Sequence, residues 1–285
     1  MIGTWGVTLV CRCFLCLNVE TPENISMTLR RRDFCAFLAS SALSTLTACR
    51  LTGSSTILNG GRISARPHQG VKTTATGRIP LGLDSGGRDA ILHLPKSESP
   101  LPLLVMLHGA TQNAEDMFWY LGSAHEEAGV AVLAPNSRDT TWDAIGGSFG
   151  PDVDFLNRSL ERIFESAAID PARICVGGFS DGASYAIGLG LLNTDLFTSV
   201  AAFSPGFVPQ EGAAQADLLA TTKPRFFISH GTHDHILPIN SCGRRIAQAL
   251  EGRGYEVTFR EFDGDHEIPA DVAREGMRWV STKRS

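Results

Sequence analysis

The stretch Ile174-Cys-Val-Gly-Gly-Phe-Ser-Asp-Gly-Ala183 decides the fold class, because it joins an apolar strand to a helix through a very tight turn. The residues before Gly178 form a run of strand length, and residues 184–192 have a helical composition. Gly178 and Gly182 flank Ser180 at positions where side chains would collide with neighbouring backbone. The pattern predicts a serine hydroxyl that stands clear of a sheet, at a helix N-terminus that favours negative charge.

Apolar runs of strand length alternate with helical patterns along the body of the chain. Strands are expected at 89–94, 103–107, 130–133, 174–176, 199–203, 226–229 and 257–262. One helix is expected from the N-cap Asn113 to Gly129, a second after Pro151, and others at 241–251 and 270–280. This alternation predicts a three-layer α/β/α sandwich with a mostly parallel sheet that helices cover on both faces.

An acid and a base for the serine follow it in the chain. Asp234 comes after the strand at 226–229, and His266 comes after the strand at 257–262. Both positions are at the carboxyl ends of strands, where open α/β sheets place their sites. We expect Asp234 to orient His266, and His266 to take the proton of Ser180.

Two backbone N–H groups are expected to form an oxyanion hole. One belongs to Ala110, in the loop after the strand at 103–107, and the other to Asp181, the residue after the nucleophile. His108 and His230 each precede a glycine at a strand end. We expect both imidazoles to pack or hydrogen-bond beneath their loops.

Other acids and histidines near Asp234 permit different interpretations. His233 and His235 flank it and could be metal ligands, but a third nitrogen or sulfur donor at useful spacing is missing. Asp263 and Asp265 are alternative acids for the imidazole at 266, although they are too close in sequence to orient its far nitrogen easily. We therefore expect neither a metal nor a cofactor-binding residue.

Residues 27–49 have the organisation of an export signal. A basic start with Arg31-Arg-Asp-Phe34 resembles a twin-arginine signal, and the apolar stretch after it is shorter than a membrane-spanning helix. Leu46-Thr-Ala-Cys49 resembles a lipoprotein box, in which Cys49 would carry the lipid anchor. Export to the periplasm or the extracellular space is expected, with a plain secretory signal as the alternative.

The remaining boundaries follow from this signal. Residues 1–26 are interpreted as a mis-assigned upstream start, because a second apolar segment ahead of the basic start serves no purpose in a signal peptide. Residues 50–76 lack periodicity and are expected to form a flexible tether. The catalytic domain is expected at 77–285.

Composition limits the class of partner. Hydrophobic residues make up 43% of the 285 residues, which is enough for a full core. The formal net charge of -5 provides no basic surface for binding nucleic acid. Five of the seven cysteines lie within the first 49 residues, which leaves Cys175 and Cys242 and no disulfide framework. Contact with a membrane is expected only through the lipid anchor.

Four ordered motifs together resemble a known family. They are His108-Gly-Ala-Thr-Gln-Asn113, Gly178-Phe-Ser-Asp-Gly182, His230-Gly-Thr-His-Asp234 and Gly264-Asp-His266. They are similar to the phospholipase/carboxylesterase family and to secreted esterases of the polyhydroxybutyrate depolymerase type. The resemblance covers residues 88–282 and implies an α/β-hydrolase fold that cleaves carboxylic esters without metal or organic cofactor. Asp181 departs from the glutamine usual in that family, so the subfamily stays open.

Three functions remain open from the sequence. The first is a serine esterase that acts on a small-molecule or polymeric ester. The second is a serine peptidase of the prolyl-oligopeptidase type, which normally carries a large extra domain. The third is a non-catalytic lipoprotein with a hydrolase fold, which would be expected to have lost a triad residue.

Overall fold

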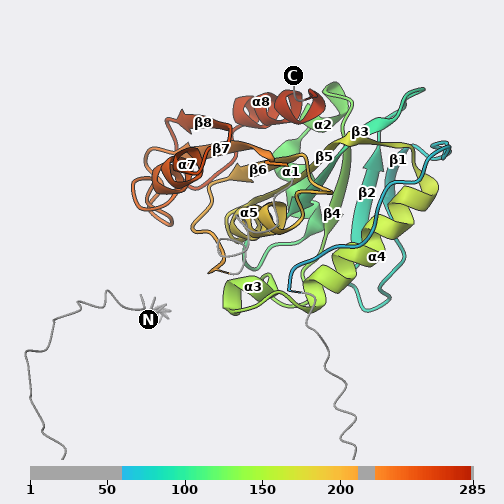
Figure 1. Cartoon of the computed structure of the whole chain (residues 1–285), viewed down its shortest axis with the longest axis horizontal. Coiled ribbons are helices and arrows are strands. Elements are labelled where there is room, and N and C mark those ends of the chain that lie inside the picture. Colours follow the sequence, from blue (N-terminus) through green and yellow to red (C-terminus); the bar gives the residue numbers. More distant parts are fainter. Residues whose placement is uncertain (1–59, 211–221, 284–285) are drawn as a thin grey trace, which may run out of the picture. The chain divides into compact units, whose positions relative to one another are not determined.

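The computed structural model describes residues 60–210 and 222–283, and an eight-stranded sheet organises them (Figure 1). The strands are β1 (Gly77–Pro80), β2 (Ala90–Leu94), β3 (Leu101–Leu107), β4 (Ala131–Pro135), β5 (Ile169–Phe179), β6 (Ser199–Phe203), β7 (Arg225–Gly231) and β8 (Val257–Phe262). Their order is β1-β2-β4-β3-β5-β6-β7-β8. β1 and β2 are antiparallel to their neighbours, and the strands from β3 to β8 run parallel.

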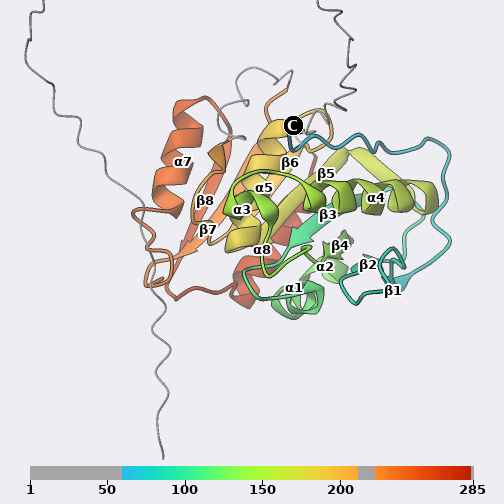
Figure 2. The same ribbon diagram turned by 90° about the horizontal axis from the view of Figure 1, so that it is seen from below.

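Helices cover both faces of this sheet (Figure 2). They are α1 (Ala114–Leu121), α2 (Ala124–Glu127), α3 (Asp143–Gly146), α4 (Pro151–Ser166), α5 (Asp181–Leu192), α7 (Gly243–Gly252) and α8 (Ala270–Ser281). One core packs α4, α5 and α7 against the sheet, and a second core packs α1, α2 and α8 against the opposite face. The predicted three-layer sandwich is therefore confirmed. In the described ranges, none of the helices is both long and apolar enough to cross a membrane.

Burial explains the composition of the central elements. Every residue of β3, β4 and β6 is buried, as expected for parallel strands that are covered on both faces. α5 is apolar all round because it is buried on all sides, whereas α4 buries one stripe and begins with Pro151 in its first turn.

The helix predicted from Asn113 to Gly129 is two helices. Asn113 caps α1 as expected, through a capping box with Asp116. Gly122 then ends α1 with a φ of 51°, a value that glycine adopts without the strain of a side chain. Gly129, with a φ of 65°, follows the short α2. The prediction identified both ends of the region and missed the break between them.

The predicted tether is wrong around Ile63 and Ala65. Ile63 and Ala65 are buried in the core, with exposed fractions of 1% and 4%. Their backbone N–H groups donate to the side-chain oxygens of Asn193 and Asn157, at 2.7 and 2.9 Å. These contacts make the segment around Ile63 and Ala65 part of the folded domain. The export signal, Cys49 and residues 1–26 lie outside the described residues.

The two cysteines of the body are both buried and free. Cys175 lies in the middle of β5 with no exposed surface, and burial raises the pKa of its thiol to about 12. Burial also raises the pKa of the Cys242 thiol. Both side chains therefore act as small apolar groups.

Candidate active site

Ser180 occupies a strained turn between β5 and α5. Its φ and ψ are 56° and -118°, in a region that residues with side chains rarely adopt. The backbone N–H of Ser180 donates to the carbonyl of Phe203 at 3.0 Å and fixes the turn to β6. Both flanking glycines are required, because a Cβ on Gly178 would lie 2.4 Å from the Gly182 carbonyl carbon and a Cβ on Gly182 would lie 2.2 Å from the Leu107 carbonyl oxygen.

Asp234 and His266 are joined by a direct hydrogen bond. His266 Nδ1 donates to Oδ2 of Asp234 at 2.7 Å. The other carboxylate oxygen accepts the backbone N–H groups of Ile236 and Leu237, at 3.0 and 2.7 Å. Asp234 is only 5% exposed, so these bonds replace the water that a carboxylate needs. They fix His266 in the tautomer whose Nε2 is free to accept a proton.

The imidazole of His266 lies beside the serine turn. Its ring centroid is 4.7 Å from the ring of Phe179, which directly precedes Ser180. Ser180 follows β5, Asp234 follows β7 and His266 follows β8, and these strands are parallel. The sheet therefore brings the three sequence-predicted residues to the edge where its parallel strands end.

His230 is hydrogen-bonded beneath its loop, as the sequence predicts, and it also contacts the acid of this group. Its ring is fully buried, and Nε2 lies 2.7 Å from the carbonyl of Leu237 and 3.2 Å from Oδ2 of Asp234. Burial lowers the pKa of His230, which favours the neutral ring. Because a neutral ring bonded to a carbonyl carries its proton on Nε2, His230 donates this N–H to Leu237 and places its positive end beside the carboxylate of Asp234.

The loop after β3 lies against the serine. A Cβ on Gly109 would be 3.3 Å from the Cβ of Ser180. The N–H groups on either side of Ala110 are used within the protein: Gly109 donates to the Gln112 side chain at 2.9 Å, and Thr111 donates to the Thr140 carbonyl at 2.7 Å. These contacts leave the N–H of Ala110 as the donor that this loop can present to a substrate.

Residues after β4 brace both candidate oxyanion donors. The indole N–H of Trp142 donates to the His108 carbonyl at 2.8 Å, and the backbone N–H of Ser137 donates to Nε2 of His108 at 3.0 Å. Burial lowers the pKa of His108, which favours the neutral ring that accepts this bond. The hydroxyl of Thr141 donates to the Asp181 carboxylate at 2.8 Å. Asp181 is the first residue of α5, where backbone N–H groups lack a partner within the helix.

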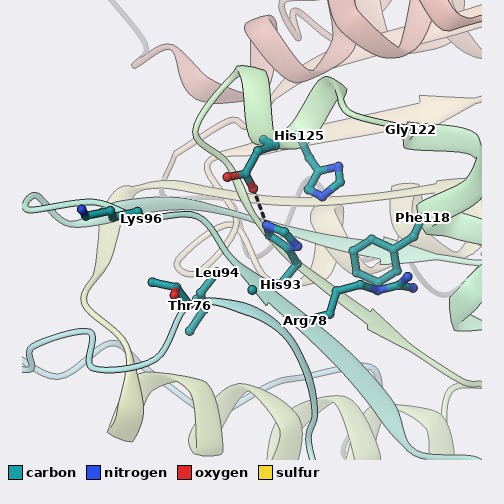
Figure 3. Close-up of a pocket in the computed structure, with 10 residues that line it drawn as sticks. Thr76, Arg78, His93, Leu94, Lys96, Phe118, Gly122 and His125 are labelled. Atoms are coloured by element: carbon teal, nitrogen blue, oxygen red, sulfur yellow. Dashed lines mark hydrogen bonds and ion pairs between the residues drawn. The ribbon is translucent and has the colours of Figure 1, made fainter.

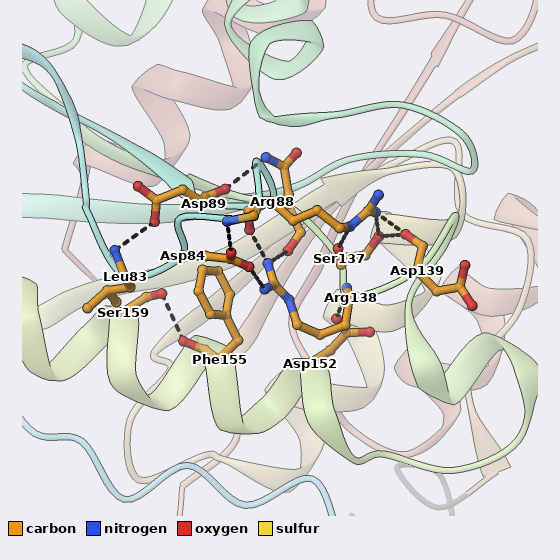
Figure 4. Close-up of polar contacts among 12 residues, drawn as sticks. Leu83, Asp84, Arg88, Asp89, Ser137, Arg138, Asp139, Asp152, Phe155 and Ser159 are labelled. Atoms are coloured by element: carbon orange, nitrogen blue, oxygen red, sulfur yellow. Dashed lines mark hydrogen bonds and ion pairs between the residues drawn. The ribbon is translucent and has the colours of Figure 1, made fainter.

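This bracing segment is itself fixed by polar contacts (Figure 4). Arg138 donates to Asp84 at 2.6 Å, and its guanidinium lies 3.7 Å from the ring centroid of Phe155 on α4. Asp152 accepts the backbone N–H of Arg138 at 2.5 Å and that of Asp143 at 2.8 Å. Asp152 is 2% exposed, and burial raises its pKa to about 6.

The alternative residues around Asp234 have other partners. His233 pairs with Asp263 at 3.1 Å and His235 with Asp265 at 2.8 Å, all on exposed side chains. The two histidines therefore face different carboxylates. The side chain of Asp265 accepts the backbone N–H of residue 266 and not the ring N–H, so it does not orient the imidazole.

Comparisons with known proteins point to esterases. The phospholipase/carboxylesterase family matches residues 155–281. Feruloyl esterase C of Emericella nidulans is 22% identical over 216 residues, which are 64% of this chain and 77% of that protein. The putative esterase NocK of Nocardia uniformis is 31% identical over 108 residues, which are 35% of this chain and 31% of its own length.

A solved structure shares the fold. It is the substrate-bound fluorophosphonate-binding serine hydrolase F of Staphylococcus aureus, with a TM-score of 0.59 and 16% identity, covering 69% of this chain and 93% of that one. The eight-stranded sheet, the serine turn and these likenesses lead to one conclusion. The chain has an α/β-hydrolase fold, and the proteins that it resembles are esterases and other serine hydrolases.

Proposed function

We propose that the chain hydrolyses carboxylic esters through an acyl-enzyme formed on Ser180. The serine oxygen attacks the ester carbonyl carbon while Nε2 of His266 takes the hydroxyl proton. The backbone N–H groups of Ala110 and Asp181 stabilise the oxyanion. When the tetrahedral intermediate breaks down, the alkoxide leaves with the proton of His266, and water releases the acid by the reverse sequence. The observation that carries this proposal is the 2.7 Å bond from His266 to Asp234 beside the strained serine turn.

The aromatic surroundings favour an ester with an aryl group. The ring of Phe179 contacts His266 at 4.7 Å and Tyr120 at 4.8 Å, and Tyr120 contacts Trp119 at 5.0 Å between ring centroids. Trp119 is 78% exposed, which is unusual for so large an apolar side chain. A continuous row of rings thus leads from the proposed base to the surface. Feruloyl esterase C, by its name, acts on esters of an aromatic acid, and we propose the same class of substrate here.

A panel of esters tests both parts of the proposal. We expect the full chain to hydrolyse p-nitrophenyl esters, with Ser180→Ala reducing kcat at least about 10³-fold. Trp119→Ala should raise KM for methyl ferulate several-fold and leave KM for methyl butyrate unchanged. Phe207→Ala, which removes another exposed ring at 41% exposure, is the matched control. Equal rates for wild type and Ser180→Ala would reject the mechanism, and equal effects of Trp119→Ala on both methyl esters would reject the aryl preference.

The same panel separates the alternatives. A peptidase of the prolyl-oligopeptidase type would cleave proline-containing peptides in preference to esters, and a non-catalytic lipoprotein would cleave neither. The intact bond between Asp234 and His266 supports catalysis over the binding role. We also propose that the chain is exported and that Cys49 carries a lipid anchor, which follows from the sequence of the leader.

A further inference from the structure

Two histidines and a glutamate meet at the opposite end of the parallel strands from the catalytic residues. His93 is on β2, and His125 and Glu126 are on α2. His93 is paired in the sheet with Val132, near the start of β4. Ser180, Asp234 and His266 follow the carboxyl ends of parallel strands. The group formed by His93, His125 and Glu126 therefore lies at the opposite end of the sheet, where these strands begin.

These three side chains have the arrangement of a metal-ligand set. One donor atom from each lies within 4.8 Å of the others. The rings of His93 and His125 meet edge to face, with centroids 4.6 Å apart, and Nε2 of His93 contacts the Glu126 carboxylate (Figure 3). They line one cavity of about 470 Å³. A solvent-filled space beside three ligands can hold the water that completes a tetrahedral zinc site.

An ordinary ion pair does not account for the whole group. His93 and Glu126 satisfy each other, but His125 is only 6% exposed, and its Nδ1 has no hydrogen-bond partner within the described ranges. A buried imidazole nitrogen without a partner is costly unless another group uses it. The positive charge of Arg78, which lines the same cavity, is paired with Glu115, and its guanidinium lies 4.1 Å from the ring centroid of Phe118.

We propose that His93, His125 and Glu126 bind a divalent transition metal, with Zn²⁺ as the best-fitting ion. Two imidazoles and one carboxylate suit zinc, whereas Ca²⁺ and Mg²⁺ require oxygen ligands. The ion joins the antiparallel strand β2 to α2 and so stabilises this edge of the sheet. Its place at the edge remote from Ser180 makes it a structural site, separate from ester hydrolysis.

Titration of the untagged, metal-free full chain with Zn²⁺ tests the proposal. We expect saturable binding of one Zn²⁺ per chain, no binding of Mg²⁺, and a Tm that rises with Zn²⁺ concentration because the ion binds only the folded state. Glu126→Gln and His93→Gln should each weaken binding at least about tenfold. Glu126 is 53% exposed, so its variant tests the site without loss of the fold.

Two control variants exclude binding elsewhere. Glu127→Gln changes the next, exposed carboxylate of α2 and should leave Zn²⁺ binding unaltered. The double change His233→Gln/His235→Gln removes the exposed histidines near Asp234 and should also leave it unaltered. The proposal is overturned if Zn²⁺ does not bind saturably, if binding survives both Glu126→Gln and His93→Gln, or if it disappears with the double variant.

Discussion

Replacement of Asp234 by asparagine should abolish most of the activity while leaving the fold intact. In the wild type one carboxylate oxygen accepts two backbone N–H groups, from Ile236 and Leu237, and the other accepts the ring N–H of His266. The amide oxygen of asparagine must take the first place, because only an oxygen can accept those bonds. Its NH₂ group then faces Nδ1 of His266, and the imidazole must carry its proton on Nε2. An Nε2 that already carries a proton cannot accept the proton of Ser180.

The wrong tautomer costs about 10⁴-fold in kcat, or about 5 kcal/mol of activation free energy. The assay is steady-state hydrolysis of a p-nitrophenyl ester at pH 7, with circular dichroism and Tm to establish that Asp234→Asn is folded. Asp263→Asn is the matched control, because Asp263 is exposed and pairs with His233. It should keep kcat within about twofold. The reasoning is refuted if Asp234→Asn retains a tenth of the wild-type kcat, or if Asp263→Asn loses as much.

Three further predictions concern the serine turn, a buried acid and the leader. Gly182→Ala places a Cβ 2.2 Å from the Leu107 carbonyl oxygen, so urea unfolding should show a free energy of unfolding lower by about 3 kcal/mol, and activity should be lost. Gly252→Ala is the control, because its Cβ would meet nothing within 4 Å, and it should leave the free energy of unfolding unchanged. Burial raises the pKa of Asp152 from 3.8 to about 6, so between these values the folded chain holds a proton that the unfolded chain has lost. The free energy of unfolding should therefore fall as pH rises through this window, by at most about 3 kcal/mol, and urea unfolding of Asp152→Asn at pH 4.5 and 7 should lack this component. In a bacterial host, the wild type should fractionate with membranes and Cys49→Ala with soluble material; equal partition of both would contradict the lipid anchor.

The sequence predicted the parts of the fold that depend on local pattern. The seven expected strands are all present, and the apolar runs marked them because both sheet faces are covered. β1 escaped prediction, since it is a four-residue edge strand with alternately exposed residues and Pro80 at its end. The burial of Ile63 was equally invisible, because its partner Asn193 is distant in sequence and the segment around it lacks periodicity.

In the candidate site, too, local sequence motifs predicted some features, and others depend on contacts between distant parts of the chain. Ser180, Asp234 and His266 could be selected because each follows a recognisable strand and belongs to a motif. The contact of His230 with Asp234 could not be predicted, because a histidine before a glycine gives no sign of where its ring points. Likewise, His93 is a single polar residue in a strand, and only packing brings it to α2, 32 residues further along the chain.

The most direct test of the account is the covalent labelling of Ser180. The full chain, incubated with an organophosphonate that mimics the tetrahedral intermediate, should gain the mass of one adduct, and peptide mapping should locate it on Ser180. Ser180→Ala should gain none and should hydrolyse no ester. An adduct on another residue, or ester hydrolysis that persists in Ser180→Ala, would contradict the proposal that this serine is the nucleophile.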